Sequence, residues 1–91
     1  MVKLPSIGRF AGPDYVLRLK EIDAAIESYT RAVDANENDY MAHKSLGVAY
    51  MIKYFTDRDE KTRALGLEQW EISLQLNPNQ PKLKRFLDQY R

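Results

Sequence analysis

Apolar residues recur at helical spacing in four successive segments of the chain, and no segment alternates between apolar and polar positions as a β-strand would. The first series follows Pro13, where Asp14 stands in a position to cap a helix. It predicts a helix that ends before the turn-forming residues 35–39, Ala-Asn-Glu-Asn-Asp. Its apolar members are Val16, Leu17, Leu19, Ile22, Ala25, Ile26, Tyr29, Ala32 and Val33.

The second series predicts a helix from about Tyr40 to Tyr54 with two faces. One face consists of His43, Leu46, Gly47, Tyr50 and Tyr54. The other consists of Met41, Lys44, Val48, Met51 and Ile52. Residues 56–59, Thr-Asp-Arg-Asp, are expected to end this helix.

A third helix is predicted to begin near residue 57 and to end near Leu76. Asp57 and Glu60 have the spacing of a capping box, with Asp in place of the usual Ser or Thr. The helix carries two apolar stripes: Leu67, Trp70 and Leu74, and Leu65, Ile72 and Leu76. A helix with two apolar stripes is expected to lie between two neighbours.

A short fourth helix is predicted after Pro81, because proline is tolerated in the first helical turn. Its apolar members are Leu83, Phe86, Leu87 and Tyr90. Short connections make successive helices antiparallel neighbours. The predicted fold is therefore all-α, a stack of about four antiparallel helices over residues 14–91. Residues 1–13 contain four Pro and Gly residues and predict a flexible or latch-like segment.

Two stretches share a pattern of a small residue, an aromatic residue and a second small residue at matching offsets: Ala25, Tyr29 and Ala32, and Gly66, Trp70 and Ser73. Before the second stretch, His43, Leu46, Gly47 and Tyr50 follow the spacing of an opening helix, and Pro78 closes the unit. Over residues 15–90 the chain therefore resembles the tetratricopeptide-repeat family. The resemblance implies stacked helix pairs, with small residues where helices approach closely and aromatic rings filling the gaps between layers.

The first stretch lacks an opening helix, because the prolines and glycines of residues 1–13 would break one. The chain is thus expected to hold one and a half repeats and a closing helix. Such repeats bury their apolar faces by stacking, so something must cover Leu17, Ile22, Ile26 or Val33. Three covers are open: the N-terminal segment with its Leu4, Ile7 and Phe10, a second copy of the chain, or a partner. Self-association or an N-terminal latch is the hypothesis.

Sixteen residue steps separate Tyr50 from Gly66, where a family repeat uses about nine. The surplus of about seven is close to two helical turns, which lengthens both helices without rotating their faces. We therefore expect a taller helical hairpin with Tyr54 and Phe55 filling the added layer. A charged loop at residues 56–61, presented to a partner, is the alternative.

The composition narrows the function classes. The 91 residues are 44% apolar and 30% charged, as in a single soluble globular domain. No apolar run approaches the length of a membrane span, and no secretory signal is recognisable, so a cytoplasmic location without membrane contact is expected. The chain has no cysteine, and His43 is its one histidine, without a nucleophile motif beside it. No enzymatic activity, metal or cofactor is expected.

Charge is unevenly distributed although the net charge is only +1. Residues 21–40 hold Glu21, Asp23, Glu27, Asp34, Glu37 and Asp39 against Arg31. Residues 82–91 hold Lys82, Lys84, Arg85 and Arg91 against Asp88. This asymmetry either helps copies or a charged partner to find register or reflects two solvated faces. The basic stretch also allows weak nucleic-acid contact as a further alternative.

The family resemblance implies a concave surface that binds a peptide or a partner helix. The implied partner-binding residues are Met41, Lys44, Val48, Met51 and Ile52, with Lys82 or Arg85 as a rim. Some family members grip a C-terminal carboxylate with paired lysines and asparagines, but Val48 stands where an asparagine is needed. The main hypothesis is a small adaptor or assembly factor, and the alternative is a structural module that forms homo-oligomers.

Overall fold

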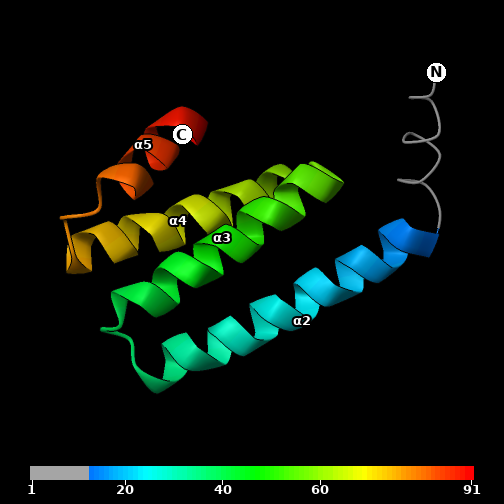
Figure 1. The fold of residues 1–91 in the computed structure, drawn as a ribbon, viewed down its shortest axis with the longest axis horizontal. Helices are drawn as coiled ribbons and strands as arrows, with labels where there is room; N and C mark the ends of the chain where they lie inside the picture. Colours follow the sequence, from blue (N-terminus) through cyan, green and yellow to red (C-terminus); the bar gives the residue numbers. More distant parts are fainter. Residues whose placement is uncertain (1–12) are drawn as a thin grey trace.

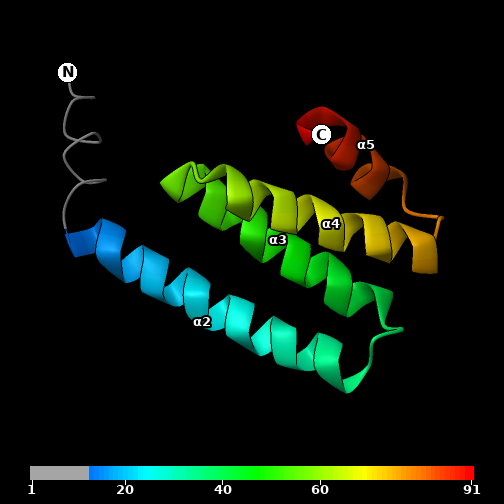
Figure 2. The same cartoon turned by 180° about the vertical axis from the view of Figure 1, so that it is seen from behind.

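The computed structural model describes residues 13–91, which form four α-helices and no strand. The helices are α2 (Pro13–Ala35), α3 (Tyr40–Asp57), α4 (Glu60–Leu76) and α5 (Pro81–Tyr90). Successive helices run antiparallel, with α3 and α4 in the middle and α2 and α5 at opposite edges (Figure 1 and Figure 2). The prediction of an all-α fold with about four helices is confirmed for this part of the chain.

The N-terminal prediction is only partly covered by the described residues. Helix α2 begins at Pro13 itself, with Asp14 inside its first turn rather than before the helix. Proline suits the first helical position because its missing N–H has no intrahelical partner there. The rest of the predicted latch, with Leu4, Ile7 and Phe10, lies outside the described residues.

Aspartates start the two central helices. Asp39 caps α3, where its Oδ1 accepts hydrogen bonds from the backbone N–H groups of Met41 (2.9 Å) and Ala42 (3.3 Å). Asp59 caps α4 in the same way and accepts from the N–H of Lys61 at 2.9 Å. Both side chains satisfy donors that a helix start leaves without partners.

The predicted capping box is wrong, because α3 continues through Asp57. Arg58 then adopts the left-handed conformation, with φ of 58°, and its N–H donates to the carbonyl of Tyr54. This ends α3 and leaves Asp59, not Asp57, in the capping position. Only Arg58 and Asp59 lie between the helices, so the candidate loop over residues 56–61 shrinks to a two-residue turn.

The surplus residues therefore lengthen the helices, as a taller hairpin requires. The added layer contains Tyr54, which is partly buried, and Phe55, which is 45% exposed. The Phe55 ring lies 5.6 Å from the Tyr54 ring and 5.4 Å from the Tyr90 ring of α5. The extension is thus held by aromatic contacts between α3 and the last turn of α5.

The core lies where α3, α4 and α5 meet. Met51, Trp70, Leu83 and Leu87 are only 2–4% exposed and form one cluster. Tyr54, Leu67, Leu74 and Tyr90 pack against it. Burial of these large side chains away from water stabilises the association of three helices.

Within the described part of the chain, helix α2 is covered on one side only. Ile22 is buried against the rest of the fold, and the Lys53 ammonium of α3 lies 2.8 Å from the Asp23 carboxylate. In contrast, Val16 and Leu17 are each 55% exposed, and Tyr29 is 38% exposed. An edge helix with this much exposed apolar surface still offers a face to another structure.

Candidate partner-binding surface

Helices α3 and α4 form a complete pair around Trp70. A Cβ built on Gly47 would lie 2.3 Å from Cδ1 of the Trp70 ring, so only glycine allows this approach. The Trp70 Nε1 donates to the backbone carbonyl of Lys44 at 3.3 Å. The backbone of α3 therefore lies directly against the indole, and this fixes which face of α3 points outward.

Polar contacts lock the other end of the pair. The Ser73 hydroxyl, fully buried, donates to the carbonyl of Tyr40 at 2.8 Å, and Gln80 Nε2 donates to the carbonyl of Ser73 at 3.1 Å. His43 is also buried, with Nε2 2.8 Å from the carbonyl of Glu37 and Nδ1 2.7 Å from Oε1 of Gln69. Both ring nitrogens of the histidine are thus engaged in holding the turn and α4 in place.

A first groove runs along the seam between α2 and α3 and has a volume of about 260 Å³. Ala25 and Tyr29 of α2 form one wall. The other wall belongs to α3: Met41, Lys44, Ser45, Val48, Ala49 and Ile52. Most of these side chains are apolar, so the groove suits apolar side chains or the methylene stems of lysine and arginine.

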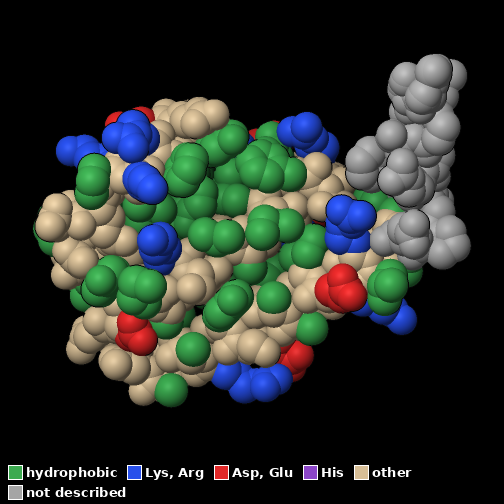
Figure 3. Space-filling view, in the orientation of Figure 1, with side chains coloured by type: hydrophobic (Ala, Val, Ile, Leu, Met, Phe, Trp, Pro, Cys, Tyr) green, Lys and Arg blue, Asp and Glu red, His purple; other side chains and the backbone are tan. Residues whose placement is uncertain are grey.

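A second groove, of about 350 Å³, lies between the start of α3 and the start of α5. It is lined by Tyr40, Met41, Lys44, Asn77, Asn79, Gln80, Pro81, Lys82 and Leu83. Since Met41 and Lys44 line both grooves, the two form one continuous surface across α3. Figure 3 shows this face, with hydrophobic side chains gathered over its middle and basic side chains over the end that carries α5.

The structure brings together most of the partner-binding residues that the sequence predicts. Met41, Lys44, Val48 and Ile52 line the first groove, and Lys82 joins Met41 and Lys44 in the second. Arg85 is exposed on α5 but lines neither groove.

The assignment of Met51 to this surface is wrong. Its side chain is 2% exposed and belongs to the core with Leu83 and Leu87 of α5. Met51 lies one turn after Gly47, so it shares the inward side of α3. A Cβ on Gly66 would lie 3.0 Å from its Sδ, which places the thioether over the bare backbone of α4.

A third groove, between α4 and α5, was missed by the sequence analysis. Its volume is about 390 Å³, and its lining is Glu71, Leu74, Gln75, Pro78, Lys84, Leu87 and Arg91. The stripe of Leu67, Trp70 and Leu74 was the available signal, since Leu74 lines this groove and the stripe packs against α5. Helix α5 covers one side of this region and leaves the rest open.

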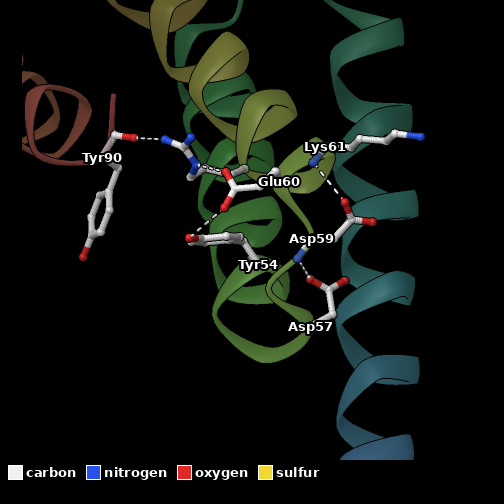
Figure 4. A network of polar contacts seen from close by, with 7 residues as sticks. Tyr54, Asp57, Asp59, Glu60, Lys61 and Tyr90 are labelled. Atoms are coloured by element: carbon white, nitrogen blue, oxygen red, sulfur yellow. Dashed lines mark hydrogen bonds and ion pairs between the residues drawn. The ribbon is translucent and has the colours of Figure 1, made fainter.

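Side chains on either side of the turn between α3 and α4 hold the end of α5 in place (Figure 4). Tyr54 donates to the Glu60 carboxylate at 3.5 Å, and Glu60 accepts from the Arg63 Nε at 2.7 Å. Arg63 also donates to the carbonyl of Tyr90. These contacts give the adjoining ends of α3 and α4 a structural role in positioning the last helix.

One lysine of α3, Lys53, has a shifted pKa. The hydrogen bond from Lys53 to the Asp23 carboxylate raises the pKa of Lys53 above its ordinary value, and partial burial opposes this shift. The negative charges of Asp23 and Asp57 add to the increase. The pair therefore connects the middle of α2 electrostatically to the C-terminal part of α3.

Two kinds of feature are absent from residues 13–91. No helix in this range is long and apolar enough to cross a bilayer. Within the same residues, no three His, Asp or Glu side chains gather in a group suited to a metal ion.

Comparisons with known protein families, with curated proteins and with solved structures found no match to this chain. The family resemblance rests on the residue pattern of this sequence alone.

Proposed function

We propose that the chain is a non-catalytic protein–protein interaction module that binds a peptide or a partner helix along α3, as an adaptor or assembly factor. The main support for this proposal is the continuity of the two grooves through Met41 and Lys44. The resemblance to tetratricopeptide repeats supports the same role. The engagement of both His43 nitrogens in structural contacts supports a function without catalysis.

The exposed side chains along α3 suit an apolar ligand face. Met41, Val48 and Ile52 are 50%, 39% and 47% exposed. They span about 16 Å of helix axis, which is the length of a short partner helix. Burying such side chains stabilises a complex by roughly 25 cal/mol for each Å² removed from water, and methionine adapts to irregular surfaces.

Charge at one end of the surface favours a ligand with an acidic residue beside its apolar face. Lys44 and Lys82 line the second groove together. Polar amide side chains, Asn77, Asn79 and Gln80, surround them. An acidic side chain of the ligand placed here gains attraction from both lysines, which fixes the direction in which the ligand lies.

The experiment uses a displayed library of amphipathic helical peptides, selected on the wild-type chain. Lys44→Glu with Val48→Asp should weaken the selected peptides about tenfold or more, because the variant reverses one charge and inserts another into the apolar seam. The matched control is Lys61→Glu with Leu65→Asp, which makes the same kinds of change at exposed positions of α4 outside both grooves. A library that yields no binder, or binders that both variants retain equally, contradicts the proposal.

A further inference from the structure

We propose that copies of this chain associate head to tail, with α5 of one copy seated in the α2–α3 groove of the next. In the same contact, α2 of the next copy covers the α4–α5 groove of the first. The two helices would together form a helix pair built from two chains. This assembly goes beyond the proposed function and does not depend on it.

The two edges of the molecule are open in complementary ways. At one edge, α2 carries Ala25, Tyr29 and Ala32, and no helix within residues 13–91 packs on them as α3 packs on the matching residues of α4. At the other edge, α5 follows α4 as α3 follows α2, with no further helix in the described residues. The helix that would cover α2 is therefore supplied by α5 of another copy, and the helix that would follow α5 is supplied by α2 of that copy.

The complete pair provides the template for this contact. Gly66, Trp70 and Ser73 are buried beneath α3, and Ser73 has no exposed surface. The matching residues of α2 are open: Ala25 is partly exposed, while Tyr29 and Ala32 are exposed. A helix laid on α2 as α3 lies on α4 would cover these three positions.

The dimensions of α5 fit the groove. Its 10 residues give a helix of about 15 Å, and the α3 wall of the groove from Met41 to Ile52 is about 16 Å long. Within one chain, α5 lies beside α3 and leaves the second groove, which Lys44 and Lys82 line, open. Stacked copies would repeat that arrangement, so the assembly leaves the second groove open at each chain, while α5 of the neighbouring copy competes with a partner for the first groove.

Charge favours a second copy as the occupant. Helix α2 carries five acidic and three basic residues, whereas Lys82–Arg91 carries four basic residues and one acidic residue. Lys84 and Arg91 line the groove that α2 of the next copy would cover. Opposite net charges on the two contacting helices attract each other and select this pairing over contacts between like edges.

The register follows from the contacts inside the chain. The eighth residue of α3, Gly47, lies opposite Gly66, and the first, Tyr40, lies opposite Ser73. Transferred to α5 and α2, the same offset sets Asp88 opposite Ala25. It brings Lys84 to the Tyr29 ring as a cation–π pair, and it brings Arg91 beside Glu21. Since the contact joins two different surfaces, repetition extends the assembly into an open stack unless the rotation closes a ring.

The test is the mass of the full chain in analytical ultracentrifugation over a range of concentrations at low salt. The wild type should grow beyond a dimer as concentration rises, and added salt should reduce its mass. Glu21→Arg alone and Arg91→Glu alone should each weaken association about tenfold, because each sets like charges against each other.

Two combinations separate this contact from a general charge effect. The double variant Glu21→Arg with Arg91→Glu should regain most of the association. An equimolar mixture of the two single variants should also associate, because each interface between unlike copies then pairs opposite charges. Glu68→Arg, an exposed change on α4 outside the three grooves, is the control and should behave as the wild type. Circular dichroism checks that every variant keeps its helices.

Three outcomes overturn the proposal. A chain that stays monomeric at all concentrations has its α2 face covered in another way. A mass that stops at the dimer and is the same for Arg91→Glu as for the wild type points to a contact between two α2 helices. Failure of both charge-swapped combinations to associate removes the assigned register.

Discussion

The same three-residue pattern occurs in α2 and in α4, and the two copies have opposite surroundings. In α4, Trp70 is 4% exposed and holds the α3 backbone through its Nε1. In α2, the matching Tyr29 is 38% exposed and lines an open groove. The pattern therefore specifies a helix surface able to receive another helix, while the covering helix must be supplied by the rest of the chain or from outside it.

The composition of the two copies agrees with their surroundings. The α4 copy uses glycine at its first position, where the Met51 side chain and the Gly47 backbone come close. The α2 copy uses Ala25, and it has Ala32 where α4 has the hydrogen-bonding Ser73. Where another helix covers the pattern, it needs the smallest residue and a buried polar contact. Where the pattern is open, the helix is stable without either.

The largest expected contrast comes from removing the aromatic ring of each copy. Trp70→Ala should lower the free energy of unfolding by about 3–5 kcal/mol, since it leaves a cavity in the core. Tyr29→Ala should cost about 1 kcal/mol or less, because the ring is partly in water already. Chemical denaturation at a concentration where the chain is monomeric measures both. Equal losses would show that α2 is covered within the monomer.

A smaller contrast is expected at the two glycines of the complete pair. Gly47→Ala should destabilise by about 1–3 kcal/mol, because its Cβ would overlap the buried Trp70 ring, which has little room to move. Gly66→Ala should cost less, since the nearest side-chain atoms belong to the flexible Met51 and alanine favours the helix. Thermal unfolding of the two variants tests the order. A larger loss for Gly66→Ala would mean that the thioether cannot give way.

The smallest effect concerns the ion pair that ties α2 to the complete pair. Lys53→Met should cost about 0.5–1 kcal/mol at neutral pH, as is usual for a largely exposed pair. Because the pKa of Lys53 is raised in the folded chain, its contribution is present below the ordinary value of 10.5 and is lost as pH rises through the folded value. Urea unfolding of wild type and variant from neutral to strongly alkaline pH should therefore show the difference shrinking. A difference that grows with pH would contradict this sign.

The number and order of helices were predictable from the sequence because the apolar spacing and the turn residues agree along the chain. Asp39 illustrates this agreement, since it lies in a polar turn and directly precedes an apolar series. The turn at residues 58–59 was less accessible. Asp57 and Asp59 both suit a helix cap. The choice between them depends on Arg58 adopting a left-handed conformation, which an arginine does not predict.

The candidate site was predictable only where one helix decides it. Met41, Lys44, Val48 and Ile52 line the grooves because the approach of Gly47 to Trp70 orients α3. Met51 lies on the inward side of α3, one turn after Gly47, and its burial also depends on where α5 settles. The α4–α5 groove likewise depends on the partial cover that a short last helix gives to α4.

The arrangement of the helices also bears on how fast the chain folds. Within residues 13–91, every close approach of two helix backbones joins helices that are consecutive in sequence. Contacts between near neighbours close short loops, so a chain of this topology has a low contact order and is expected to fold in microseconds to milliseconds. The α3–α4 hairpin, with its two-residue turn, is the segment whose ends meet at the lowest entropic cost. It is therefore the natural nucleus, onto which α2 and α5 would add from either side.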